Sequence, residues 1–190
     1  MKREDVIIRL GRAEDADVLA QVVAMGIGCD KTLKEYCGED YLSVLREVVL
    51  SEHSQYSYRN ALVAELDGVV VGGVIGYDGG MLYPLREGTY SVIQRYHANV
   101  PSIVDETSDG EFYVDSLAVM PAYRGVGVGS ALLEAICQKA FSEGHKCVGL
   151  LVDSENPKAE QLYTSLGFRR VNATMFFDHS MWHMQREESK

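Results

Sequence analysis

The stretch that decides the fold is EFYVDSLAVMPAYRGVGVGSALLEAI, residues 111–136. Its first part has the β-branched and aromatic residues typical of a strand, which ends at Val119, and a Met-Pro turn follows. Three alternating glycines then lead directly into an amphipathic helix: Gly125, Gly127 and Gly129. Glycine lets another group approach the backbone closely, and the unpaired N–H groups at a helix N-terminus favour a phosphate. The pattern therefore predicts a cradle for a pyrophosphate group.

Two well-known phosphate loops do not fit this string. The nucleotide-hydrolase loop requires Lys and then Ser or Thr after its last glycine, whereas Ser130 and Ala131 follow Gly129. The dinucleotide fingerprint requires a third glycine at Ser130, and its acidic residue would be only loosely matched by Asp153. The string does match Arg-x-x-Gly-x-Gly, which begins at Arg124 and follows a Leu-Ala-Val run. It resembles the acyl-CoA loop of the Gcn5-related N-acetyltransferase (GNAT) superfamily.

A second signature follows in the order expected for this family. Asn156 precedes Pro157, which suits the first position of a helix because its missing N–H would be unpaired there. Helical spacing continues until a Leu-Gly-Phe string ends the helix. An Asn, a helix that carries Ala and Tyr, and then Leu-Gly-Phe are similar to the family's second motif. The resemblance is close over residues 111–170 and holds in pattern only over residues 6–77 and 168–186.

Composition favours one soluble, enzyme-sized domain. The chain has 190 residues, 46% of them hydrophobic, without a run long enough for a membrane span or the apolar middle of a signal peptide. The four cysteines show no C-x-x-C spacing, which favours buried thiols over zinc or redox motifs. A net charge of −10 argues against a nucleic-acid surface and favours cationic amine substrates over anionic ones. We therefore expect a cytoplasmic protein with no nucleic-acid, membrane or metal partner; a homodimer stays open.

The order of predicted elements indicates an α/β fold. The expected elements are a strand at 6–10, helices at 13–25 and at 33–50 (broken near Gly38), a hairpin at 61–77 turning at Asp67-Gly68, an irregular, insert-like segment at 79–110, alternating strands and helices from 111, two strands joined near Asp178-His179, and a frayed tail at 187–190. The resemblance implies a single-domain acyl-CoA N-acyltransferase (GNAT) fold over residues 1–190. That fold has a mixed, twisted sheet with helices on both faces, in which the parallel strands at 111–119 and 146–152 splay apart.

The resemblance implies acetyl-CoA as the cosubstrate, bound in the opening between these splayed strands. Splayed strands leave N–H and C=O groups unpaired, and the amides of an extended pantetheine arm can satisfy them. The implied cofactor-binding residues are Leu117 and Val119 by main chain, Asn156 beside the pantetheine, and Arg124, Gly125, Val126, Gly127, Val128, Gly129 and Ser130 around the pyrophosphate.

Acyl transfer from a thioester to an amine needs three groups. The ammonium must lose a proton, the carbonyl oxygen needs a hydrogen-bond donor as it gains charge, and the departing thiolate benefits from a proton. The resemblance places the family's general acid at Tyr163. A strand N–H of Leu117 or Val119 is the candidate donor for the carbonyl oxygen.

The base is expected on the strand at 111–119. Alternation along a strand puts Glu111, Tyr113 and Asp115 on one face, the same face as Leu117 and Val119. In the family the proton acceptor comes from positions that match Tyr113 or Asp115. Because tyrosine is not a base at neutral pH, Asp115 is the better candidate; Glu111 is the fallback, and both Glu111 and Tyr113 are candidates for substrate binding.

Two further groups of residues bear on the acceptor and on metal. The segment 55–60, QYSYRN, either lines the acceptor pocket with Tyr56, Tyr58 and Arg59 or merely covers the sheet. His179 and His183 have an H-x-x-x-H spacing, but the segment is typical of a strand and offers no third ligand, so no metal is expected.

Two functions remain from the sequence. The first is an acetyl-CoA-dependent N-acetyltransferase, an acyltransferase for groups other than aminoacyl groups, which acts on a small-molecule or peptide amine. The second is a non-catalytic module that binds or senses acyl-CoA, which would not need Tyr163 or Asp115. The presence of both residues favours the enzyme.

Overall fold

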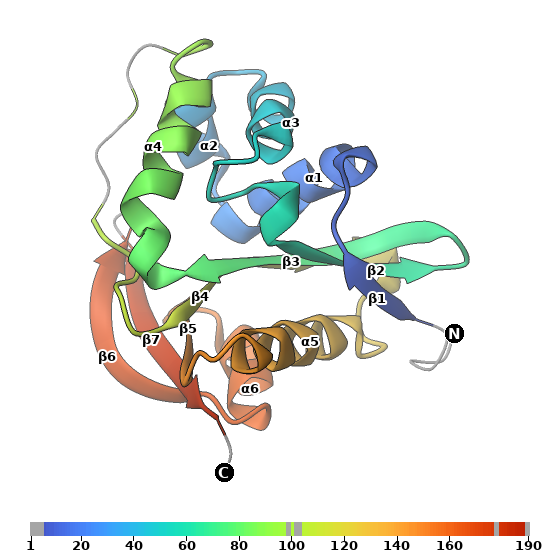
Figure 1. Ribbon diagram of the computed structural model, residues 1–190, viewed down its shortest axis with the longest axis vertical. Coiled ribbons are helices and arrows are strands. Elements are labelled where there is room, and N and C mark those ends of the chain that lie inside the picture. The colour runs from blue at the N-terminus through green and yellow to red at the C-terminus, as the bar shows by residue number, and fades with distance from the viewer. Residues whose placement is uncertain (1–5, 98–99, 101–103, 177–178, 189–190) are drawn as a thin grey trace.

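One seven-stranded sheet organises the computed structural model, which describes residues 6–97, 100, 104–176 and 179–188 (Figure 1). Its strands are β1 (Ile7–Leu10), β2 (Ala61–Leu66), β3 (Val69–Asp78), β4 (Phe112–Val119), β5 (Cys147–Asp153), β6 (Arg169–Phe176) and β7 (His179–Glu187). They lie in the order β1-β2-β3-β4-β5-β7-β6. β4 and β5 run parallel, and each other pair of neighbours is antiparallel, so the sheet is mixed.

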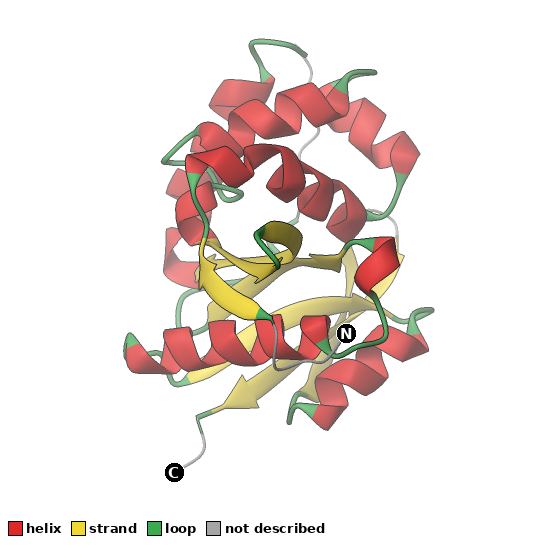
Figure 2. Ribbon diagram, turned by 90° about the vertical axis from the view of Figure 1, so that its right-hand side faces the viewer, coloured by secondary structure: helices red, strands yellow, loops and turns green. Residues whose placement is uncertain are grey.

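Helices cover both faces of the sheet, as Figures 1 and 2 show. On one face lie α1 (Ala16–Ile27), α2 (Asp30–Cys37), α3 (Tyr41–Leu50) and α4 (Leu82–Ile93); on the other lie α5 (Val128–Ser142) and α6 (Pro157–Ser165). Short 3-10 turns are η2 (Ala13–Asp15), η3 (Tyr58–Asn60), η4 (Gly79–Met81) and η5 (Pro121–Tyr123). Each face has its own apolar core, one around α5 and one shared by α1 to α4. The predicted α/β sandwich is confirmed.

Local turn chemistry explains two boundaries that the sequence predicts. The hairpin of β2 and β3 turns at Asp67 and Gly68, whose φ angles of 49° and 78° are both left-handed. A turn of this kind matches the twist of the flanking strands, which is why Asp-Gly favours it. The helical region breaks at Gly38, with φ of 80°, which separates α2 from α3.

The segment 79–110 is less irregular than the sequence predicts, because α4 occupies its first half. Pro84 is tolerated in the first turn of α4, where its missing N–H would have no helical partner. Gly88, in the middle of the helix, packs so closely that an added β-carbon would lie 1.9 Å from the His53 carbonyl oxygen. Because proline and glycine both disfavour a helix, the sequence alone does not predict α4, which tertiary packing stabilises. Residues 98–99 and 101–103 lie outside the described residues.

The expected frayed tail is also ordered at its start. Glu187 is the last residue of β7, and the N–H of Glu188 donates to the carbonyl of Lys146 at 3.0 Å. Residues 189–190 lie outside the described residues, as does Asp178 at the expected junction of the last two strands.

The predicted splay of the two parallel strands is confirmed. β4 and β5 pair only at Phe112 with Val148, Tyr113 with Gly149, and Val114 with Leu150. Both strands continue past this point, β4 to Val119 and β5 to Asp153, without pairing to each other. A wedge-shaped opening therefore lies between their carboxyl-terminal halves.

A β-bulge at Asp115 overturns the expected alternation along β4. Ser116 pairs with Ile75 and Val114 pairs with the next residue of β3, so Asp115 is an extra residue with no partner. The bulge shifts the following side chains to the other face. Tyr113 packs with Tyr77 on the face of α4, whereas Leu117 and Val119 pack against the core around α5. The prediction that all of these share one face with Asp115 is therefore wrong.

The close approach at Gly88 generates a stability prediction. Gly88→Ala should destabilise the protein by about 1–3 kcal/mol, because the added methyl group collides with a backbone carbonyl. Helix propensity alone would give the opposite sign, since alanine in a helix is favoured over glycine by about 1 kcal/mol. Urea unfolding measures the difference. The exposed Ser91→Ala, on the same helix, serves as the control and should be neutral or slightly stabilising.

Candidate active site

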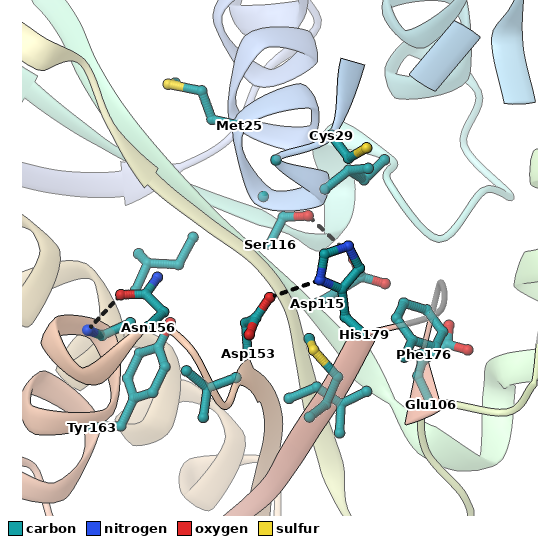
Figure 3. A pocket seen from close by; sticks show the side chains of 18 of the residues that line it. Met25, Cys29, Glu106, Asp115, Ser116, Asp153, Asn156, Tyr163, Phe176 and His179 are labelled. Carbon is teal, nitrogen blue, oxygen red and sulfur yellow. Dashed lines mark hydrogen bonds and ion pairs between the residues drawn. The ribbon is translucent and has the colours of Figure 1, made fainter. Parts of the chain in front are cut away.

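A cavity of about 570 Å³ occupies the opening between β4 and β5 (Figure 3). Its walls come from the two strands, from α6, and from the carboxyl-terminal end of α1. Six of the catalytic, cofactor-binding and substrate-binding residues that the sequence predicts line it together: Tyr56, Tyr113, Asp115, Leu117, Asn156 and Tyr163. The geometry of the splayed strands thus gathers the candidate acid, the candidate base and part of the candidate cofactor site.

Asp115 is the bulged residue of β4, and its carboxyl group lines the cavity. It accepts hydrogen bonds from the Ser116 hydroxyl at 3.1 Å and from the Tyr77 hydroxyl at 3.2 Å. Burial, and after it the negative charge of Glu106, raise the pKa of Asp115 to about 7. A carboxylate with such a pKa can accept a proton near neutral pH.

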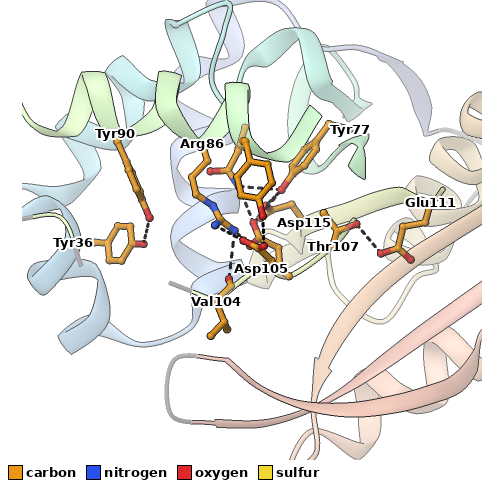
Figure 4. A network of polar contacts seen from close by, with 12 residues as sticks. Tyr36, Tyr77, Arg86, Tyr90, Val104, Asp105, Thr107, Glu111 and Asp115 are labelled. Atoms are coloured by element: carbon orange, nitrogen blue, oxygen red, sulfur yellow. Dashed lines mark hydrogen bonds and ion pairs between the residues drawn. The ribbon is translucent and has the colours of Figure 1, made fainter. Parts of the chain in front are cut away.

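Glu106 is a cavity residue that the sequence does not indicate. Only 5% of it is exposed, and it accepts hydrogen bonds from Gln55 Nε2 at 2.8 Å and from the Tyr77 hydroxyl at 3.1 Å. Its other oxygen pairs with Arg86 of α4, which also binds Asp105 at 2.7 Å (Figure 4). The sequence does not indicate Glu106 because adjacent carboxylates in a polar tract are equally typical of an exposed loop. Their buried partner, Arg86, lies on α4, a helix that the sequence does not predict because it contains Pro84 and Gly88.

Tyr163 lies on α6, on another wall of the cavity than Asp115 (Figure 3). Burial raises the pKa of its hydroxyl to about 12, so the group stays protonated at neutral pH. Its ring packs near Phe168, with the centroids 6.2 Å apart. Among the described residues no group is within hydrogen-bond reach of the hydroxyl. The tyrosine can therefore donate its proton to a molecule in the cavity.

Asn156 begins the helix that carries Tyr163. Its side-chain oxygen accepts a hydrogen bond from the N–H of Ala159 at 3.1 Å, and Pro157 is the first residue of α6, as predicted. This cap satisfies one of the N–H groups that a helix leaves unpaired at its start. Asn156 thus caps α6 and lines the cavity at the same time.

The glycine loop lies where β4 passes into α5, beyond the residues that line the cavity. Gly125 and Gly127 have φ angles of 81° and 89°, a left-handed conformation that other residues adopt only with strain. Gly129 is different: an added β-carbon would make only ordinary contacts, 3.7 Å from the Val119 side chain. Arg124 Nε donates to the Val119 carbonyl at 2.8 Å and so ties the loop to the end of β4.

Three of the predicted substrate-binding residues do not reach the cavity. Tyr58 is half-buried against the apolar core shared by α1 to α4, and Arg59 is exposed and pairs with Glu52 at 2.6 Å. Glu111 is buried just before β4. Its carboxylate is occupied by Thr107 at 2.7 Å, Gln185 at 2.8 Å and His183 at 3.0 Å. It connects the start of β4 to β7 rather than facing the opening.

Both histidines of β7 lie beside carboxylates. His179 Nδ1 lies 3.1 Å from an Asp153 oxygen, and His183 contacts Glu111. Within the described ranges, no group of three or more His, Cys, Asp or Glu side chains could hold a metal ion. Over the same ranges no helix has the length and apolar character needed to cross a bilayer.

The sequence of this chain is similar to known acetyltransferases. The model of the acetyltransferase (GNAT) family matches residues 30–168. An N-alpha-acetyltransferase of Sulfurisphaera tokodaii is 34% identical over 122 residues, which is 63% of this chain and 62% of that protein. A thialysine N-epsilon-acetyltransferase of Sus scrofa is 32% identical over 78 residues, which is 41% of this chain and 43% of that protein. The chain therefore spans less than two-thirds of the length of each of these two curated relatives.

Solved structures agree over nearly the whole chain. A crystal structure of an acetyltransferase superposes with a TM-score of 0.81 at 31% identity and covers 95% of this chain and 98% of its own. The yncA acetyltransferase of Salmonella typhimurium, solved with acetyl-CoA, shares the fold with a TM-score of 0.59 at 17% identity, over 97% and 95% of the two chains. By its family match, its sheet and its two signature loops, the chain belongs to the acetyltransferase (GNAT) family.

Proposed function

We propose that this protein transfers an acetyl group from acetyl-CoA to a primary amine by direct attack of the amine on the thioester. The observation that carries the proposal is the pairing of two groups across one cavity. Asp115 is a carboxylate that titrates near neutrality, and Tyr163 is a hydroxyl that stays protonated. A module that only binds or senses acyl-CoA would have no use for this pair.

The charges around the cavity support a cationic acceptor. Four carboxylates line it: Glu106, Asp115, Asp153 and Glu155. Among the described lining residues there is no Lys or Arg. Such a lining attracts an ammonium group and repels a phosphate or carboxylate on the acceptor. We infer a small-molecule or peptide amine; a cytoplasmic location and a homodimer stay predictions.

The direction of the backbone N–H groups of β4 supports the binding of acetyl-CoA in the opening between β4 and β5. The N–H of Met120 donates to Val71 of β3 at 2.9 Å. Because successive N–H groups of a strand point to opposite edges, those of Val119 and Leu117 point to the edge that β5 has left. They would bind the pantetheine amides or the carbonyl oxygen of the thioester. The pyrophosphate would then reach the N–H groups of residues 126–130 at the start of α5.

The reaction balances with these residues alone. Asp115 takes one proton from the acceptor ammonium, and the neutral amine attacks the thioester carbon. As the tetrahedral centre collapses, the C–S bond breaks and Tyr163 protonates the thiolate. The second proton on nitrogen returns to the tyrosine oxygen. The products are the amide, CoA thiol and one proton, which Asp115 releases to solvent.

An amine panel tests the function. Purified protein is incubated with acetyl-CoA and pooled diamines, amino acids, aminosugars and peptides, and the products are read by mass spectrometry. We expect a mass gain of one acetyl group on a cationic amine and release of CoA thiol. Tight binding of acetyl-CoA without acetylation of any amine would favour the sensing module instead.

The glycine loop yields a binding prediction with a matched control. Gly127→Ala places a side chain at φ 89° and disturbs the N–H groups at the start of α5, so acetyl-CoA should bind about tenfold more weakly. Gly144→Ala introduces the same kind of strain, at φ 96°, beyond the other end of α5, where nothing lies within 4 Å. Calorimetry should show unchanged affinity for that variant. Equal loss in both would mean that strain alone explains the effect.

Tyr163→Phe tests the general acid. General acid catalysis contributes roughly a hundredfold to ten-thousandfold. We expect the lower end for this variant, because a thiolate leaves readily and water can replace part of the help. Acetyl-CoA affinity should change little, so the loss should fall on kcat. Steady-state kinetics with a thermal melt decide the question: unchanged turnover with a lower melting temperature would assign Tyr163 to the core.

A further inference from the structure

We propose that Glu106 and Tyr77 are positioning residues that set the proton affinity of Asp115. The Tyr77 hydroxyl, which Figure 4 shows beside Asp115, turns from Asp115 to Glu106 when Asp115 takes up the proton of the acceptor. The inference rests on the proposed function, in which Asp115 is the base. Neither Tyr77 nor Glu106 has to touch the reacting nitrogen for this role.

The Tyr77 hydroxyl has one proton and two carboxylates within reach. The Tyr77 oxygen lies 3.1 Å from Glu106 Oε1 and 3.2 Å from Asp115 Oδ2, and it receives a hydrogen bond from Gln55 Nε2 at 3.0 Å. A phenol has one proton to donate. With both carboxylates ionised, only one of the two contacts can be a hydrogen bond. The other then brings two acceptors together in a buried place, which is costly.

One additional proton resolves the conflict. When Asp115 is ionised, Tyr77 donates to it, and Glu106 keeps its hydrogen bond from Gln55 at 2.8 Å. When Asp115 is protonated, its own O–H donates to the tyrosine oxygen, which then donates to Glu106. In that second state every contact of the cluster has a donor and an acceptor. The Tyr77 hydroxyl therefore has a partner in both protonation states of Asp115: it stabilises the ionised carboxylate by donating to it, and the proton is transferred no further than Asp115.

Arg86 distinguishes the two carboxylates of the cluster. The guanidinium pairs with Glu106 and with Asp105 and is only 8% exposed, so Glu106 has a buried cation in direct contact. Asp115 has no cation in direct contact among the described residues. Burial and the charge of Glu106 raise its pKa, while the hydrogen bonds of Ser116 and Tyr77 lower it. The titratable and charged groups that act on Asp115 are Tyr56, Tyr77, Arg86, Glu106 and Tyr113.

Two variants should shift the titration midpoint of Asp115 in opposite directions. Tyr77→Phe removes a donor to the ionised carboxylate, so its titration midpoint should rise by about one pH unit. Glu106→Gln removes a neighbouring negative charge, so the midpoint should fall by about as much. Tyr83→Phe is the control: its exposed hydroxyl bonds to Asp105 at 2.6 Å, outside the contacts of Asp115, and the midpoint should not move.

The titration can be followed without turnover. Carbon-13 NMR of protein labelled at the aspartate carboxyl reports Asp115, identified by the signal that Asp115→Asn lacks. An unchanged midpoint in Tyr77→Phe, or shifts of the same sign in both variants, would overturn the proposal. If Glu106→Gln did not fold, Tyr77→Phe alone would decide. A thermal melt of each variant shows whether it folds.

The pH dependence of kcat separates this inference from the proposed function. As a base Asp115 must be ionised, so the wild-type rate should rise with pH through a midpoint near 7. The midpoint should move up in Tyr77→Phe and down in Glu106→Gln, together with the NMR value. If the NMR midpoints shift as expected but the kinetic ones do not, Asp115 is tuned as described but is not the base, and the mechanism fails.

Discussion

The parting of β4 and β5 after three residue pairs is the constraint on which the rest of the site depends. A continued ladder would satisfy the backbone groups of both strands and would leave no room for a ligand. In the parted form, N–H groups of Leu117 and Val119 face an opening instead of a strand. Buried backbone groups of this kind are costly unless something else pairs with them. In the proposed function, the amides of an extended pantetheine arm would pair with these groups, as another strand would.

The bulge at Asp115 lets one strand serve two incompatible environments. Without the extra residue, alternation would put Asp115 on the same face as Leu117. Either the carboxylate would then lie in the apolar core or the leucine would lie among polar groups. With it, Asp115 turns toward Tyr77, while Leu117 returns to the apolar core around α5. On the side of Asp115, α1 also comes close to the strand: a β-carbon at Gly26 would lie 3.0 Å from the Ser116 hydroxyl. The bulge thus lets Asp115 line the cavity while Leu117, two residues later, packs in the apolar core.

Features that depend on local rules could be predicted from the sequence, and those that depend on distant packing could not. The Asp67-Gly68 turn, the glycine loop and the Asn156 cap follow from φ preferences and capping within a few residues. The bulge has no such signature, because register depends on the partner strand. The helix α4 was missed since Pro84 and Gly88 oppose it locally, and its place is set by contact with the His53 carbonyl. Glu106 was missed for the same reason, because its partner Arg86 belongs to that helix.

Polar contacts, rather than apolar burial, fix the segment that carries Glu106. It lies between α4 and β4 without regular secondary structure. Arg86 holds it from one side through Asp105 and Glu106; Thr107 holds it from the other by donating to Glu111, which His183 and Gln185 bind in turn. Buried ion pairs add little net stability, but loss of one partner leaves an uncompensated charge. These ion pairs determine the position of Glu106: they hold its carboxylate at hydrogen-bond distance from Tyr77, which also contacts Asp115 at the point where β4 and β5 part.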